Sequence, residues 1–110
     1  MARLAAIDIG SNAIRLRIAD VDPPQDGPDG PRFYAFREVQ AERASVRLGH
    51  DVFTRGELEP SVIAAACDAL RKFRAAMDDA KVDRYRAVAT SAAREAKNGD
   101  LLVELSLIHI

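Results

Sequence analysis

The 110-residue chain has little of several features that define common protein classes. It has one cysteine, Cys67, so no internal disulfide can form, and this composition suits a reducing cytoplasmic compartment. Its two histidines, His50 and His109, stand alone and show no metal-ligand spacing. No apolar run is long enough to cross a membrane, and the run Met1 to Ile7 ends at Asp8, too early for a signal peptide. We therefore expect a cytoplasmic protein without a membrane partner.

An excess of charge of one sign is also missing. The 16 lysine and arginine residues are intermingled with 17 aspartate and glutamate residues, and the formal net charge is -1. Such a balance gives no field that would attract nucleic acid, so no nucleic-acid partner is predicted. The length suits one small domain with a modest core.

The stretch Asp8 to Asn12 lies between an apolar run, Leu4 to Ile7, and an alternating run, Ala13 to Ala19. Backbone N–H groups in a turn of glycine, serine and asparagine can hold phosphate oxygens. The carboxylate of Asp8 can bind a metal ion, directly or through water. The alternative is an ordinary hairpin turn that begins with an aspartate. The spacing alone favours neither interpretation.

The residues around this stretch predict a β-hairpin. Residues 4–9 carry apolar side chains on both faces, as a central strand requires. Residues 13–19 alternate, with Arg15 and Arg17 on the polar face, so this strand is half solvated or its arginines have partners. The short connection predicts antiparallel pairing.

Turn-forming residues and the alternation of apolar and polar side chains predict the segments between residues 21 and 56. The density of proline and glycine predicts an exposed loop over residues 21–31. A third strand is predicted over residues 33–40, with a short continuation at residues 45–48. Residues 49–56 are expected to be an irregular surface loop.

A long amphipathic helix is predicted over residues 60–80, because apolar side chains recur there at three- and four-residue spacing. Cys67 belongs to this pattern and is interpreted as a core residue. A fourth strand is predicted over residues 85–90, then a short helix over residues 92–97, and another helix from Leu101. This order of elements indicates an α/β layered fold.

Ser91 and Arg94 fall in the first turn of the helix predicted after the fourth strand. Free N–H groups, a hydroxyl and a guanidinium would converge there, which makes a second anion site. The alternative is a helix cap with a solvent-facing arginine, and without further information that alternative is narrowly favoured.

Two segments together carry a family resemblance. Asp8 to Leu16 closely resembles the opening phosphate-binding hairpin of the Ppx/GppA family, whose members are exopolyphosphatases and guanosine pentaphosphate phosphohydrolases. Val88 to Gly99 resembles that family's second signature, and Val46 to Gly49 matches in order and spacing between them. The resemblance covers roughly residues 4–104. One departure is Ala13, where the family commonly has serine.

The resemblance implies an α/β fold: a ribonuclease-H-like, actin-type ATPase lobe with a mixed sheet that opens with an antiparallel hairpin and has helices packed on it. Sugar kinases, heat-shock chaperones and actin share the first motif. The implied reaction is attack of water on a terminal phosphoryl group of polyphosphate or guanosine pentaphosphate, releasing orthophosphate, with Mg²⁺ as cofactor. The implied catalytic residues are Asp8, which also holds the metal, and Arg94. The implied phosphate-binding residues are Gly10, Ser11, Asn12, Ser91 and Arg47.

The resemblance also implies that the parent protein is longer. The family's water-activating glutamate and its second phosphate loop lie downstream of the second signature, and neither occurs here. Residues 1–104 are interpreted as the N-terminal lobe of a phosphatase that often forms a homodimer. Residues 105–110 resemble the translation of a transposon-end sequencing adapter and are interpreted as a non-native tail. We expect this fragment to be inactive alone. The alternatives are a non-hydrolytic nucleotide or alarmone sensor, or another actin-like ATPase or sugar-kinase lobe.

Overall fold

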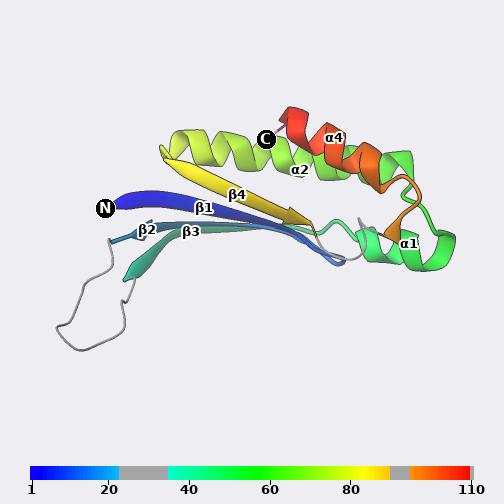
Figure 1. Ribbon diagram of the computed structural model, residues 1–110, viewed down its shortest axis with the longest axis horizontal. Coiled ribbons are helices and arrows are strands. Elements are labelled where there is room, and N and C mark those ends of the chain that lie inside the picture. The colour runs from blue at the N-terminus through cyan, green and yellow to red at the C-terminus, as the bar shows by residue number, and fades with distance from the viewer. Residues whose placement is uncertain (23–34, 90–94, 110) are drawn as a thin grey trace.

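The strands form one mixed sheet, and the helices α2 and α4 lie along one of its faces (Figure 1). The computed structural model describes residues 1–22, 35–89 and 95–109. The strands are β1 (Ala2–Ile9), β2 (Ile14–Val21), β3 (Phe36–Ala44) and β4 (Arg84–Ala89). The helices are α1 (Leu48–Arg55), α2 (Pro60–Asp79) and α4 (Gly99–His109). The strand order is β3-β2-β1-β4, with β1 antiparallel to β2 and parallel to β4.

The predicted hairpin is confirmed. β1 and β2 pair without interruption from Ala2 opposite Val21 to Ile9 opposite Ile14. The alternation in β2 is confirmed as well, because its isoleucines and leucine are fully buried while Arg15 and Arg17 are exposed. A one-residue slip would turn this apolar face to solvent, so the pattern fixes the register.

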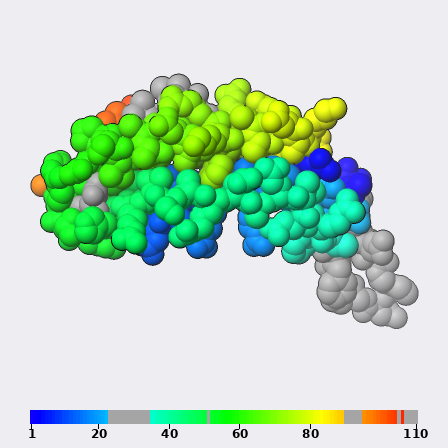
Figure 2. All heavy atoms as spheres, turned by 180° about the vertical axis from the view of Figure 1, so that it is seen from behind, coloured from blue at the N-terminus to red at the C-terminus, as the bar shows by residue number. Residues whose placement is uncertain are grey.

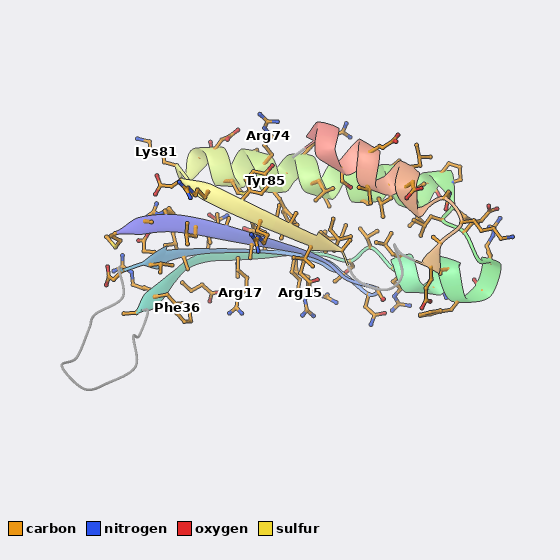
Figure 3. All side chains as sticks on the ribbon, viewed as in Figure 1. Arg15, Arg17, Phe36, Arg74, Lys81 and Tyr85 are labelled. Carbon is orange, nitrogen blue, oxygen red and sulfur yellow. The ribbon has the colours of Figure 1, made fainter. Side chains whose placement is uncertain are left out.

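β1 is a central strand, as predicted, with β2 on one side and β4 on the other, but its two faces are not both buried. Ala5, Ile7 and Ile9 are buried, but Ala6 and Asp8 between them are exposed. The physical reason is that alanine is small and apolar enough to sit on either face. We call this uncovered side of β1, β2 and β3 the open face; Arg15 and Arg17 point from it, away from α2 and α4 (Figure 3). Seen from behind, β3 and the two helices α1 and α2 form much of the molecular surface (Figure 2).

Two expectations around the third strand are wrong. β3 runs through to Ala44 without the predicted break, and the segment after it is not a continuation strand. The expected irregular loop is instead the helix α1, in which Leu48 and Val52, four residues apart, are buried in the core. Gly56 ends this helix in the left-handed region at φ 75°. A helix this short, containing glycine, histidine and threonine, has little intrinsic propensity and depends on its packing.

The long helix is confirmed as α2, and its buried side chains follow the predicted stripe. The buried set is Ile63, Ala66, Cys67, Ala69, Leu70, Phe73 and Met77. Burial raises the pKa of the Cys67 thiol, with the charge of Arg71 partly offsetting the rise, so this cysteine is an inert core residue as predicted. None of the described helices is long and apolar enough to span a membrane.

The last helix is also confirmed, with a different start. α4 begins at Gly99 rather than at Leu101, and Asp100 lies in its first turn. The helix continues through residues 105–109, and the carbonyl of buried Leu102 accepts a hydrogen bond of 2.6 Å from the hydroxyl of Ser106. Residues 92–94, the first half of the short helix predicted over residues 92–97, lie outside the described residues.

Candidate phosphate-binding site

The turn between β1 and β2 is held by hydrogen bonds from two sides. Within the turn, the N–H of Gly10 donates to the carbonyl of Ala13 at 3.0 Å. From outside it, the N–H of Gly49 in α1 donates to the carbonyl of Ser11 at 2.8 Å. Ser11 is half-buried and Asn12 is exposed. The turn is therefore held in place while its tip faces solvent, as a phosphate-binding turn requires.

The helix α1 brings Arg47 to the same end of the sheet. Arg47 is exposed and is the N-cap residue of α1, two positions before the Gly49 that contacts the turn. The helix is anchored because Leu48, its first residue, is fully buried in the core. In Figure 1, α1 lies beyond the end of the sheet at which β1 and β2 are joined.

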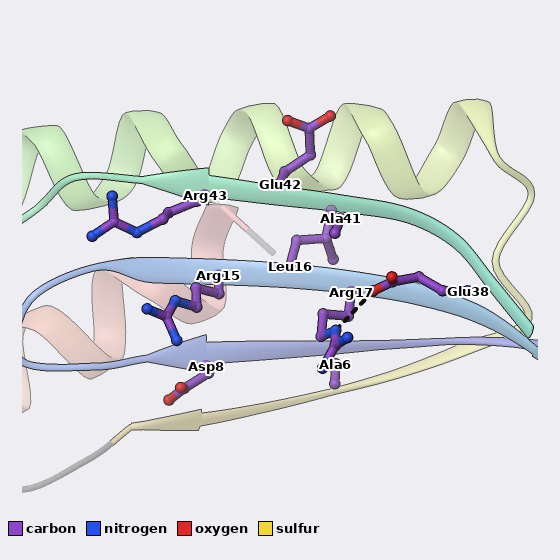
Figure 4. Close-up of a pocket in the computed structure, with 9 residues that line it drawn as sticks. All are labelled: Ala6, Asp8, Arg15, Leu16, Arg17, Glu38, Ala41, Glu42 and Arg43. Carbon is purple, nitrogen blue, oxygen red and sulfur yellow. Dashed lines mark hydrogen bonds and ion pairs between the residues drawn. The ribbon is translucent and has the colours of Figure 1, made fainter. Parts of the chain in front are cut away.

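A row of charged residues crosses the open face beside the turn. Asp8 is the register partner of Arg15, and Arg15 is the register partner of Arg43 in β3. All three are exposed, and their side chains extend over the same end of the sheet (Figure 4). The described residues form no ion pair with Arg15 or Arg43, although Arg43 donates to the hydroxyl of Ser45 at 3.2 Å.

The two arginines are a like-charged pair directly opposite each other on neighbouring strands. Such a pair destabilises a sheet, and a bound anion would remove the repulsion. Two residues further along β2, by contrast, Arg17 forms an ion pair with Glu38 at 2.8 Å. Both sets of side chains lie around a shallow hollow of about 480 Å³ on the open face (Figure 4). Its lining residues are Ala6, Asp8, Arg15, Leu16, Arg17, Glu38, Ala41, Glu42 and Arg43.

Of the residues predicted from sequence, the structure brings Asp8, the turn and Arg47 to one end of the domain. Ser91 and Arg94 lie outside the described residues. The described residues that flank them are at this same end. Ala89 is the register partner of Ile9, and the N–H of Lys97 donates to the carbonyl of Gly56 at 3.0 Å.

Sequence reasoning missed Arg15 and Arg43 as candidate site residues. Arg15 could have been found, because a tight hairpin places it opposite Asp8. Arg43 could not, because its position depends on a register shift between Ile18 and Ala19 in the pairing of β2 with β3. No local pattern in the sequence encodes that shift.

The donor set near the turn suits a metal ion that is shared with a ligand. The described residues contain no group of three or more metal-ligating side chains, and Asp8 is the carboxylate beside the turn. Mg²⁺ keeps several waters and is commonly bound by one or two carboxylates together with substrate phosphates. One exposed carboxylate beside a turn whose tip faces solvent fits that mode of binding.

Comparison with known proteins identifies related phosphatases. Residues 29–105 match the Ppx/GppA phosphatase family. The chain is 37% identical to exopolyphosphatase 2 of Mycobacterium tuberculosis over 106 residues, which are 96% of this chain and 31% of that protein. It is 30% identical to a bifunctional 3-dehydroquinate synthase/phosphatase of Fusobacterium nucleatum, over 91% of this chain and 15% of that protein.

Solved structures share the fold. A type II variant of the Aquifex aeolicus Ppx/GppA phosphatase superposes with a TM-score of 0.81 at 31% identity, covering 100% of this chain and 33% of that one. An exopolyphosphatase from Cytophaga hutchinsonii gives a TM-score of 0.79 at 27% identity, over 98% of this chain and 31% of that one. The chain thus spans about a third of the length of the Mycobacterium tuberculosis protein and of these two solved structures. The predicted ribonuclease-H-like, actin-type lobe is confirmed, and the chain belongs to the Ppx/GppA phosphatase family.

Proposed function

We propose that this chain supplies the first phosphate-binding lobe of a phosphatase that removes terminal phosphoryl groups from inorganic polyphosphate or guanosine pentaphosphate and releases orthophosphate. The observation that carries the proposal is the exposed carboxylate of Asp8, two residues before a turn that is held in place by α1. The names of the relatives, two of them exopolyphosphatases, favour hydrolysis over a sensor that only binds.

Each part of the site has a role in this proposal. The N–H groups and side chains of Ser11 and Asn12 hold phosphate oxygens at the tip of the turn. Arg15 and Arg47, with Arg94 from the segment after β4, neutralise the charge of the phosphate chain as the terminal group is transferred to water, and Ser91 donates a hydrogen bond to a phosphate oxygen. Catalysis of this type depends on positioned positive charge, so the arginines contribute most when the phosphate is fixed by the turn.

Mg²⁺ is the proposed cofactor, and Asp8 is the residue that would hold it, directly or through water. When bound, the ion would neutralise phosphate charge. The group that activates water and the second phosphate loop are proposed to come from the part of the protein beyond this lobe. The whole protein is proposed to be cytoplasmic and to act as a homodimer.

Orthophosphate release tests the proposal. The full-length protein and the 110-residue chain are compared with tripolyphosphate or guanosine pentaphosphate as substrate, each with Mg²⁺ and with EDTA. We expect the full-length protein to turn over at least one substrate in a Mg²⁺-dependent manner and the isolated lobe to be nearly inactive. Failure of the full-length protein to release orthophosphate from either substrate would contradict the proposal. Robust turnover by the isolated lobe would contradict the assignment of catalytic groups to the second lobe.

A further inference from the structure

Gly49 lies where α1 and the phosphate-binding turn approach each other most closely. The residue is buried, and its N–H makes the hydrogen bond of 2.8 Å to the carbonyl of Ser11. A Cβ atom added at position 49 would lie 2.8 Å from the Cβ of Ser11 and 3.3 Å from both the carbonyl oxygen of Ser11 and the ring of Phe53. Side-chain carbons do not approach one another to 2.8 Å, so any other residue at this position requires movement.

The movement would affect the turn itself. The Cβ of Ser11 is bonded directly to the main chain, so it cannot swing aside as the end of a long side chain would. On the other side, α1 is held by Leu48 and Val52, both buried in the core. The tip of the turn is exposed at Asn12, and the turn is closed by its own hydrogen bond from Gly10 to Ala13. The turn, rather than α1, is therefore the part that would move, and it would move as a unit.

We propose that Gly49 is a positioning residue that sets the place of the phosphate-binding turn relative to the body of the lobe. Its role in catalysis rests on the proposed function, whereas its structural effect on the turn does not. The contact with Ser11 is the link from the helix α1 to the turn, because the bond between Gly10 and Ala13 only closes the turn on itself. Arg47 is carried by the same helix, so the contact also fixes the distance between that arginine and the turn.

The test compares the Gly49→Ala variant with the unchanged chain by NMR of ¹⁵N-labelled protein. We expect large amide shift changes at Gly10, Ser11 and Asn12, and at least a tenfold faster hydrogen exchange at the position-49 amide. The Ser11→Gly substitution removes the carbon that would clash at 2.8 Å. In the Ser11→Gly background, the same change at position 49 should therefore produce a much smaller effect on the turn.

Gly56→Ala is the matched control. It alters a glycine at the other end of α1, where φ is 75° and a side chain is strained, and where the nearest atom to an added Cβ is 4.0 Å away on Lys97. This variant should lower the midpoint of thermal unfolding without changing the amide shifts of Gly10, Ser11 and Asn12. If Gly49→Ala does not fold, Ser11→Gly alone is compared with the double variant, in which the closest contact is relieved.

The proposal is overturned by unchanged turn amides in Gly49→Ala, or by equal perturbation with and without Ser11→Gly. In the full-length protein, Gly49→Ala should lower kcat/KM for tripolyphosphate by about 10- to 100-fold, as displacements near 1 Å do in other enzymes. That loss should be smaller when the change is made in the Ser11→Gly background. If the full-length protein proves inactive, the proposed function fails, while the NMR comparison still decides the role of Gly49.

Discussion

Charged residues lie at both ends of the sheet, and the two groups are arranged in opposite ways. At the end away from the turn, Asp20 is buried at 5% exposure and accepts two hydrogen bonds from Arg3, at 2.8 and 3.1 Å. Arg37 adds a third, at 3.3 Å. At the turn end, Asp8 and its arginine neighbour Arg15 are exposed, and the described residues pair with neither of them.

The difference separates charges that are satisfied within the fold from charges that face solvent. Arg3 also donates to the carbonyl of Ala80 at 2.9 Å, and its main chain exchanges hydrogen bonds of 2.8 Å with Asp83, so it joins β1 and β2 to the end of α2 and the start of β4. The hydrogen bonds from Arg3 lower the pKa of Asp20 despite its burial. Charges that are satisfied in this way stabilise the fold, whereas charges left exposed beside a turn are available to a ligand.

The largest expected effect is on turnover at the turn end. In the full-length protein, Asp8→Ala should lower kcat by about 100- to 1,000-fold, because the carboxylate proposed to hold Mg²⁺ is lost. The midpoint of thermal unfolding should stay unchanged, since Asp8 is exposed. Arg94→Ala should lower kcat in the same way. Asp78→Ala, at an exposed residue of α2, is the control and should change neither quantity. Normal turnover in Asp8→Ala would remove that residue from the site.

At the end of the sheet away from the turn, we expect a loss of stability without a loss of turnover. Asp20→Ala leaves Arg3 and Arg37 without their partner, so it should lower the midpoint of thermal unfolding by roughly 5–10 °C. The protein that remains folded at 25 °C should keep its turnover, because no ligand is held there. Calorimetry and orthophosphate release on the same samples measure the two quantities. A loss of kcat in the folded fraction would show that the two ends are not independent.

Acid should weaken the charge cluster around Asp20. The folded-state pKa of Asp20 is lowered, so its contribution to stability is complete above its unfolded pKa of about 4 and is lost as the pH falls through the folded value. We therefore expect stability to decline below about pH 4. An Asp20→Asn variant should show a shallower decline over that range in urea unfolding. Equal slopes for the variant and the unchanged protein would contradict this assignment.

The smallest change, in the midpoint of thermal unfolding, is expected from the like-charged pair Arg15 and Arg43. Arg43→Glu places a carboxylate opposite Arg15, so it should raise the midpoint of unfolding by about 1–3 °C while weakening binding of tripolyphosphate. Arg17→Glu makes the same change of charge but breaks the pair with Glu38, so it should lower the midpoint by a similar amount. Scanning calorimetry decides between them. A fall in the midpoint for Arg43→Glu would mean that the two arginines do not repel.

Local patterns predicted the parts of the fold that depend on local contacts. The alternation of apolar and polar residues predicted β2, and apolar residues at three- and four-residue spacing predicted α2. Both patterns are local because β2 and α2 each bury one face of a single regular element. The helix α1 was missed because its sequence has little helical propensity and its packing with the core decides its structure. The exposure of Ala6 has a related cause: which face of β1 the helices cover is not written in β1.

The site was predicted in the same uneven way. Asp8 and the turn follow from turn chemistry and from the resemblance to the family, and they lie where a ligand can reach them. Gly49 was noticed only as part of a motif, and its contact with Ser11 appears only once α1 has folded. Residues brought together across strands or by a helix need the three-dimensional arrangement before their relation can be seen.

The two partners of β1 join it at different stages of folding. Its pairing with β2 is a hairpin, which closes a short loop and forms within microseconds in isolated hairpins. Its pairing with β4 joins Leu4 to Arg84, so the strands and helices between them must be in place before that edge is closed. We therefore expect the turn between β1 and β2 to be among the first structures to form and the parallel edge among the last. On a ribosome, the turn would be complete long before β4 has left the exit tunnel.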